Sequence, residues 1–356
     1  MDPDALLRRG AFALLAAAFV AAPACKVDSG NIHTERIDYG EVLVRSWKDQ
    51  LLLNTVRIRH MDPPMLLDVA SIIHQHAISG DAGAAATFDP GKWSGLTGTV
   101  TASSHFENRP TFTYAPVHGE QFTRTMLTPV QPAVLAFLLE SGWPVDILFR
   151  VYVKRVNGLR NRRGTGRYLR PADAEFDRLI ALLQQFQIED QLHMQLVRQG
   201  DKPGTESLVL ALTGEGSERA GEVRKLLKLA PDAQQVPIGY GSVQQGDKDI
   251  ALLTRSMVEV MLEFSSTVDV PEEDVKEGRT LPVLAPDKAS GPSLRIRSSD
   301  TEPTDAYASA FYRNRWYWID DRDFASKTIF TTALLILSLT ETGGTSVAPV
   351  VTISTH

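Results

Sequence analysis

The sequence has little cysteine: Cys25 is the only one among 356 residues. A single thiol excludes an internal disulfide framework and any metal or nucleophilic site that needs several cysteines. The apolar run at residues 11–22 is also shorter than the roughly 20 residues of a membrane-spanning helix. Stability must therefore come from a hydrophobic core, and a hydrophobic content of 43% is sufficient to build one.

Recognisable catalytic motifs are missing as well. The sequence contains no H-E-x-x-H, no G-x-S-x-G, no P-loop and no complete G-x-G-x-x-G, and Gly164-Thr165-Gly166 and Gly214-Glu215-Gly216 are predicted to be turns. The formal net charge of -6 gives no argument for a nucleic-acid partner. We therefore expect no nucleic acid, no cofactor, no resident metal and no catalytic set, which favours a non-enzymatic protein.

The first 24 residues have the three parts of a secretory signal peptide. Arg8 and Arg9 give a positive start, residues 11–22 form an uncharged apolar core, and Ala22-Pro23-Ala24 supplies small residues for a peptidase. This pattern predicts that residues 1–24 are cleaved during export.

Cys25 directly follows this segment, in the position that is lipidated in the bacterial lipobox. The match departs from the usual pattern, which has Leu where this chain has Ala22, and cleavage by an ordinary signal peptidase would leave a free exported thiol. A lone cysteine falls on that position by chance only about once in several hundred chains of this length. We therefore expect lipid attachment at Cys25. Because Lys26 stands where Asp would favour inner-membrane retention, we expect the outer membrane, facing the periplasm.

Beyond the anchor, the pattern predicts a short tether and an α+β body. Residues 25–38 are polar and unpatterned, so they reach at most about 45 Å when fully extended. Residues 39–356 are expected to fold into a globular region, with a subdivision near 159–170 as an alternative. Helical and strand patterns interleave without a regular βαβ rhythm, which favours a mixed, mostly antiparallel sheet with interleaved helices.

The periodicity predicts particular elements. Helices are expected over 39–59, 171–188, 218–230, 252–264 and 325–340, and short helices cut by Pro129, Pro132 and Pro144 over 120–159. Strands are expected over 65–74, 192–199, 207–214, 236–243, 293–299, 306–320 (with a turn at Arg313-Asn314) and 346–354. Two further strand runs flank Asn108-Arg109-Pro110 as a hairpin candidate, and 79–98 and 269–292 are expected to be loops.

Two clusters suggest carboxylate or metal chemistry. His74 and His76 lie two residues apart on an expected strand and so share a face, but no acidic residue nearby completes a metal site. Asp320, Asp321 and Asp323 stand between a strand and a helix, where they could act as an acid/base cluster. Asp is also a preferred N-cap residue, and we favour helix capping over catalysis or Ca²⁺ binding for this cluster.

Two further segments suggest binding. The basic segment 159–170 carries Arg160, Arg162, Arg163, Arg167 and Arg170, whose guanidinium groups suit phosphate or carboxylate ligands, although a solvated loop is the simpler interpretation. The segment "FYRNRWYWID" gathers aromatic side chains around a tight turn. Alternation places at least half of them in the core, and an exposed remainder would offer an interface or a carbohydrate-stacking surface. These aromatic residues are Phe311, Tyr312, Trp316, Tyr317 and Trp318.

Several long segments resemble uncharacterised lipoproteins of Gram-negative bacteria. They are "LLLNTVRIRHMDPPMLLDV", "RPTFTYAPVHGEQFTRTMLTPV", "WPVDILFRVYVKRVNGLRN" and "WYWIDDRDFASKTIFTTALLILS", and the similarity covers most of the chain after the signal. The resemblance implies export and a lipid anchor at Cys25. It implies no reaction, catalytic residue or partner.

The sequence thus favours an envelope lipoprotein that acts as a binding or structural component, with the membrane as a partner through its lipid and an envelope protein as a further partner. One alternative is an envelope hydrolase that uses Asp320, Asp321 and Asp323. The other is a protein that binds anionic headgroups through the arginines of 160–170.

Overall fold

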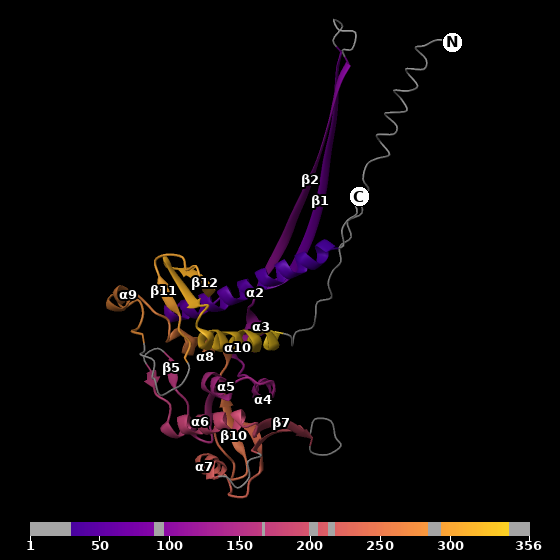
Figure 1. Ribbon diagram of the computed structural model, residues 1–356. Helices are drawn as coiled ribbons and strands as arrows, with labels where there is room; N and C mark the ends of the chain where they lie inside the picture. Colours follow the sequence, from indigo (N-terminus) through magenta and orange to yellow (C-terminus); the bar gives the residue numbers. More distant parts are fainter. Residues whose placement is uncertain are drawn as a thin grey trace. The chain divides into compact units, whose positions relative to one another are not determined.

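The computed structural model describes residues 30–88, 96–165, 168–198, 206–212, 218–283 and 293–341. The chain divides into two compact units, Met1–Trp47 and Lys48–His356. The predicted signal peptide, Cys25 and the strand expected at 346–354 lie outside the described residues. Figure 1 shows that the described chain mixes helices with paired strands.

Helix α2 (Gly30–Arg59) is the first described element. It ends where expected, shortly before Pro63-Pro64, but it begins nine residues before the expected start at 39 and so includes much of the predicted tether. The border between the two units falls within this helix, after Trp47. In the second unit, Leu51, Leu52 and Val56 are buried at helical spacing, as the periodicity predicts.

Strands β1 (Leu67–Phe88) and β2 (Leu96–Pro116) form one long antiparallel hairpin (Figure 1). The prediction of a turn at Asn108-Arg109-Pro110 was wrong, because these residues lie inside β2, opposite His76, Gln75 and His74. The loop expected at 79–98 was also wrong for most of its length. Its alanines and glycines continue the two-residue strand period, and their small size does not prevent backbone pairing.

Prolines divide the helices that follow, as predicted, but the end of the range expected to be helical forms strands at Val153–Val156 and Leu159–Arg160. Pro132 is the first residue of α4 (Pro132–Glu140), and Pro144 is the N-cap of α5 (Val145–Tyr152). The other helices of this part are α3 (Gly119–Phe122), the π-helix η1 (Thr123–Leu127), α6 (Ala174–Ile188) and α7 (Glu218–Leu226).

A six-stranded sheet follows the order β4-β3-β10-β9-β8-β7. Strands β9 and β10 are parallel, and every other neighbouring pair is antiparallel. The strands expected over 192–199 and 207–214 are confirmed as β7 and β8, which pair with each other in antiparallel orientation. The strands are β3 (Val153–Val156), β4 (Leu159–Arg160), β7 (Leu192–Arg198), β8 (Glu206–Leu212), β9 (Gln235–Tyr240) and β10 (Ile250–Thr254).

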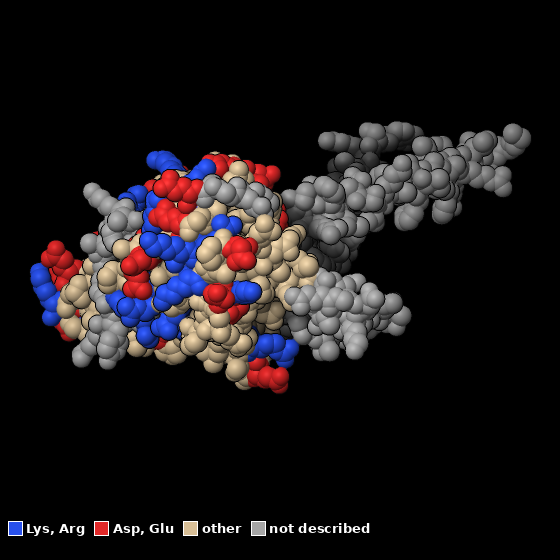
Figure 2. All heavy atoms as spheres, turned by 90° about the horizontal axis from the view of Figure 1, so that it is seen from below, with Lys and Arg blue, Asp and Glu red and all other residues tan. Residues whose placement is uncertain are grey.

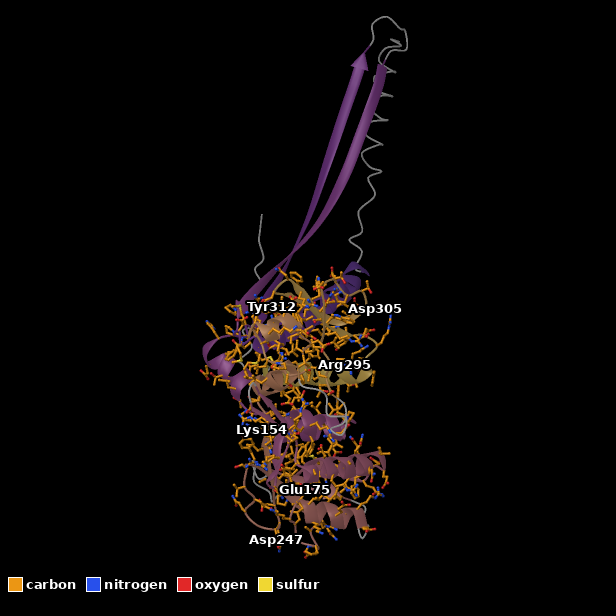
Figure 3. All side chains as sticks on the ribbon, turned by 90° about the vertical axis from the view of Figure 1, so that its left-hand side faces the viewer. Lys154, Glu175, Asp247, Arg295, Asp305 and Tyr312 are labelled. Atoms are coloured by element: carbon orange, nitrogen blue, oxygen red, sulfur yellow. The ribbon has the colours of Figure 1, made fainter. Side chains whose placement is uncertain are left out.

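A three-stranded sheet of order β11-β13-β12 precedes the last described helix, α10 (Phe324–Glu341). Its strands are β11 (Arg297–Ser299), β12 (Ala306–Tyr312) and β13 (Arg315–Asp320). The predicted turn is confirmed: Arg313 and Asn314 have φ of 50° and 61°, as the mirror-image hairpin turns require. Figure 3 labels Asp305, the residue before β12, and Tyr312, the last residue of β12.

Two predictions in the middle of the chain need correction. The helix expected over 252–264 is strand β10 followed by α8 (Met257–Ser265), because Ser256 and Glu259 form a capping box that fixes the helix start. The loop expected over 269–292 contains α9 (Glu272–Lys276). The basic segment 159–170 holds β4, β5 (Arg163–Thr165) and β6 (Tyr168–Arg170) and lies within the second unit.

The fold is therefore mixed α+β with mostly antiparallel sheets, as expected. One continuous hydrophobic cluster joins the C-terminal part of α2 to α5, α6, α8, both larger sheets and α10. Among the described helices, none combines the length and apolar character that crossing a membrane requires.

Candidate functional site

The basic segment 159–170 is held to the body by ion pairs. Arg160 donates from its backbone N–H (2.8 Å) and from Nε (3.2 Å) to Asp173, the N-cap residue of α6. Arg162 Nε donates to Glu263 Oε1 on α8 at 2.6 Å. Of the other two predicted ligand-binding residues, Arg163 opens β5 and Arg167 lies outside the described residues. At least two of the four arginines thus serve the protein's own carboxylates.

Glu263 is the centre of this attachment. It is buried, it accepts the backbone N–H of Gly164 at 2.9 Å, and the guanidinium of the buried Arg255 lies 3.8 Å from its Oε2. Arg255 itself donates to the carbonyl oxygens of Arg150, Val151 and Arg162. A Cβ atom at Gly164 would approach the Glu263 carboxylate to 3.3 Å, so glycine permits the close contact. The cluster stabilises the approach of β5 to α8.

The aspartates at 320–323 act mainly on the start of α10. Asp323 accepts the backbone N–H of Ser326 at 3.1 Å and its hydroxyl at 2.8 Å, which is helix capping. Asp321 accepts Lys327 Nζ at 2.8 Å, and Asp320 pairs with Arg297 at 3.2 Å. Each carboxylate has a partner inside the protein, so the geometry gives no support to an acid/base pair.

The aromatic turn packs against the end of α2. His60 is buried, its Nε2 lies 3.4 Å from the Tyr317 hydroxyl, and its ring centroid is 5.7 Å from that of Tyr312. Tyr312 donates to Asp62, which Arg313 also contacts at 3.0 Å. Burial, followed by the nearby Arg313, lowers the pKa of His60. This half of the aromatic segment is therefore core, as expected.

The other side of the turn is open to solvent. Phe311 is exposed, and its ring lies 5.2 Å from that of the half-buried Trp316. Arg297 lies over the Trp318 ring at 5.3 Å between centroid and guanidinium carbon. These contacts leave one exposed aromatic pair at the tip.

The remaining predicted site residues are Cys25, His74 and His76. Cys25 is outside the described residues. His74 and His76 are on β1, opposite Pro110 and Asn108 of β2, so they are two residues apart on one strand as expected. A search of the described residues finds no group of three metal-ligating side chains.

A cavity of about 780 Å³ lies at the C-terminal end of α2, within the second unit. Its described walls come from the end of α2, from Gly164 on β5, from α8 and from the segment 275–282 that contains the end of α9. Its volume is within the range of small-molecule sites. The apolar part of the lining consists of Ile58, Met61, Leu262, Val275, Leu281 and Pro282.

Arg59 is the buried cation of this cavity, with 9% of its surface exposed. Its Nη2 donates to the Leu281 carbonyl at 2.6 Å, and its own carbonyl accepts the Thr280 hydroxyl at 2.9 Å. Its Nε is buried and has no hydrogen-bond partner among the described residues. Burial lowers the pKa of Arg59, yet an arginine stays protonated in proteins. Arg59 is therefore a charged residue of the lining, and its Nε–H is buried and has no hydrogen-bond partner among the described residues.

The remaining polar groups of the lining are already used as donors. Ser265 donates to the Leu262 carbonyl at 2.7 Å, and Ser266 donates to that of Glu263 at 2.6 Å. Arg279 pairs with Glu277 at 2.6 Å and is largely exposed. The hydroxyls retain lone pairs that accept hydrogen bonds. Among the described lining residues, Arg59 is thus the group best suited to an anion.

Sequence reasoning missed Arg59 and Glu263 as site residues. Each depends on a partner far along the chain: Arg59 contacts a carbonyl 222 residues away, and Arg162 lies 101 residues before Glu263. The one local signal was the pair Arg57 and Arg59 in the last turn of a predicted helix, which ordinarily serves the helix dipole.

Comparison with known proteins gives no information about the function of this site. No protein-family model, curated protein or solved structure matches the chain.

On the face formed by α6 and α7, exposed arginines are paired with glutamates, unlike the buried Arg59 of the cavity. Figure 2 shows basic and acidic side chains side by side on the face that it presents. Arg178 pairs with Glu222 through two contacts of 2.7 Å, and Arg219 pairs with Glu189 at 2.7 and 2.8 Å. These exposed pairs contribute little free energy and supply matched controls for the buried arginines.

Proposed function

We propose that the chain is an envelope lipoprotein, held at the outer membrane through Cys25, whose body binds an anionic amphiphile in the cavity beside α2. The anchor rests on the signal pattern and on the position of the only cysteine. The binding role rests on the cavity. A protein anchored to a bilayer through Cys25 has ready access to amphiphilic molecules.

The single observation that carries the binding role is the buried Arg59 with an unpartnered Nε. A buried donor without a partner costs roughly 1–3 kcal/mol, and more when the group is charged. A ligand carboxylate or phosphate would recover that free energy through a charge-assisted hydrogen bond. Six apolar lining residues would at the same time cover an acyl or other apolar body.

The test uses the full chain with Cys25→Ser, so that it is purified without detergent, which would compete for the cavity. Lauric acid and methyl laurate are the probes, because they differ only in the charged head. Calorimetric titration should show that lauric acid binds at least about tenfold more tightly than its ester. Equal affinities would contradict the role of Arg59.

Two variants and a control sharpen this test. Arg59→Met removes the cation and keeps an extended apolar side chain, so the preference for the acid should disappear. Leu262→Trp fills the cavity from α8 and should weaken both probes, which keeps the test decisive if Arg59→Met unfolds. Arg178→Met, at an exposed ion pair, should leave binding unchanged.

The anchor has its own test. Intact mass spectrometry of protein from native membranes should show a chain that begins at Cys25 and carries diacylglycerol and acyl mass. Detergent partitioning of Cys25→Ala should then show release from the membrane fraction. An unmodified wild-type chain would replace the anchored protein with a free periplasmic one and would leave the cavity proposal standing.

A further inference from the structure

The hairpin β1–β2 carries an inference that is independent of the cavity. The two strands pair along their whole length, from Leu67 opposite Pro116 to Phe88 opposite Leu96, with one irregularity at Val69/Ser71. They form a sheet of two strands, and neither pairs with another described strand. Each strand therefore has one edge at which no described strand supplies backbone partners.

A hairpin of this length is poorly matched to a sheet of only two strands. Strand β1 has 22 residues, which at about 3.3 Å per residue gives roughly 70 Å. An isolated two-stranded hairpin is marginally stable in water, and further strands are normally needed. A hairpin of this length therefore needs additional strands for stability, and the described residues of one copy do not provide them.

The edges also lack the devices that ordinarily prevent pairing. Natural edge strands carry lysines, prolines or inward charges. Neither strand contains lysine, and proline occurs only at Pro110 and at the terminal Pro116. Over 72–88 and 96–106 the one Asp, Glu, Lys or Arg is Asp81. Most of both edges is thus open to pairing.

The residue pattern gives the two faces of the hairpin different character. In β2, Thr97, Thr99, Thr101 and Ser103 occupy odd-numbered positions, and their partners across the hairpin are Thr87, Ala85, Gly83 and Asp81. The even-numbered positions belong to the opposite face, where Val100 pairs with Ala84 and Phe106 with Ile78. Over 81–88 and 96–103 the even-numbered positions are all apolar and the odd-numbered positions are mostly polar, so added strands must keep the same alternation there.

We propose that the hairpins of several copies of this chain pair edge to edge, with β2 of one copy lying antiparallel to β1 of the next. A second copy supplies a strand of the required length and alternation. Because the two paired edges differ, the contact is head-to-tail and repeats from copy to copy. The polar and apolar faces then continue across the assembly.

Charge is compatible with this arrangement. If the contact between copies repeats the register within the hairpin, Glu107 lies opposite Ala77, Arg109 opposite Gln75, and Asp81 opposite Ser103. No two like charges face each other directly, which would destabilise the pairing.

Shortening the hairpin tests the proposal in the full lipidated chain. One variant joins Ala84 to Val100 through Asn-Gly, and a second joins Ala77 to Glu107 in the same way. These residues are paired in the hairpin, and Asn-Gly suits a two-residue turn. Sedimentation velocity in one detergent should show oligomers for the wild type, weaker association for the first variant and monomers for the second.

Cross-linking tests the direction of pairing. In a Cys25→Ser background, one preparation carries Ala84→Cys and another carries Val100→Cys, while Gly98→Cys and Ala102→Cys allow for a shift of two residues. Mixing the β1 and β2 variants should give disulfide dimers, and each alone should give few. Equal yields for each variant alone would overturn the head-to-tail arrangement. A monomeric wild type, or oligomers that survive both truncations, would overturn hairpin pairing itself.

Discussion

The six-stranded sheet and the β1–β2 hairpin differ in how their strands find partners. Strand β8 lies between β7 and β9, and its Leu208 and Leu210 are buried in the hydrophobic cluster. The hairpin strands are three times as long but pair only with each other among the described elements. A continuous apolar run in β8 and a two-residue alternation in part of the hairpin thus both form strands. Neither pattern specifies whether the partner lies in the same chain, which is why substitutions in the body and in the hairpin should have different consequences.

The largest effect is expected from the buried ion cluster of the body. Glu263→Ala removes the acceptor of Arg162 and of the Gly164 N–H, and it leaves the buried Arg255 without its nearby carboxylate. Breaking a buried pair in this way costs about 3–5 kcal/mol. Urea unfolding monitored by circular dichroism measures the loss. Glu222→Ala, at an exposed pair, should cost less than about 1 kcal/mol. Similar losses in the two variants would show that the cluster is not a structural centre.

The next largest effect is a pH dependence of the free energy of unfolding, which we expect from the buried His60. Burial lowers the pKa of His60, so the unfolded chain binds a proton below about pH 6.5 that the folded chain does not bind. The free energy of unfolding should therefore fall as pH decreases from 7 to 5, by at most about 1.4 kcal/mol per pH unit.

His60→Gln checks the source of this dependence. Glutamine keeps a group that can bond the Tyr317 hydroxyl and does not titrate. Urea midpoints measured across the pH range should fall less steeply for this variant than for the wild type. Parallel curves would assign the acid sensitivity to other groups.

A smaller effect is expected at the start of α10. Asp323→Ala removes the acceptor of the Ser326 N–H and should cost about 1 kcal/mol, as N-cap losses usually do. Asp323→Asn keeps the cap and should cost less. Thermal unfolding measures both, and Asp321→Ala serves as the exposed control. A cell-wall activity lost in Asp323→Asn at unchanged stability would instead revive the hydrolase alternative.

The sequence predicted those elements whose ends are set by nearby residues, such as turn residues and prolines. Arg313-Asn314 predicted the β12–β13 turn, and Pro144 predicted the start of α5. The helix expected from 252 shows the limit of periodicity: an apolar run read as one helix is a strand followed by a helix. The capping box at Ser256 and Glu259 was the local signal that separates them.

The candidate site was less predictable, because its contacts join distant segments. The arginines of 160–170 were visible in the sequence, but their attachment to Asp173 and Glu263 depends on how β4 and β5 meet α6 and α8. The unpartnered Nε of Arg59 is likewise a property of the assembled cavity. Charge density alone cannot distinguish a ligand site from an internal ion pair.

The smallest effect on the body is expected from the largest deletion. Joining Ala77 to Glu107 through Asn-Gly removes 78–106 but keeps the base of the hairpin, where the Val117 N–H bonds the Leu66 carbonyl at 2.9 Å and both residues are buried. Because β1 and β2 share no sheet with the body, its unfolding free energy should change by less than about 0.5 kcal/mol. Urea unfolding at low protein concentration measures this in the monomer. A loss comparable to that of Glu263→Ala would mean that the hairpin is part of the folding unit, whereas an unchanged body would confirm that the hairpin is dispensable for the fold of a single copy.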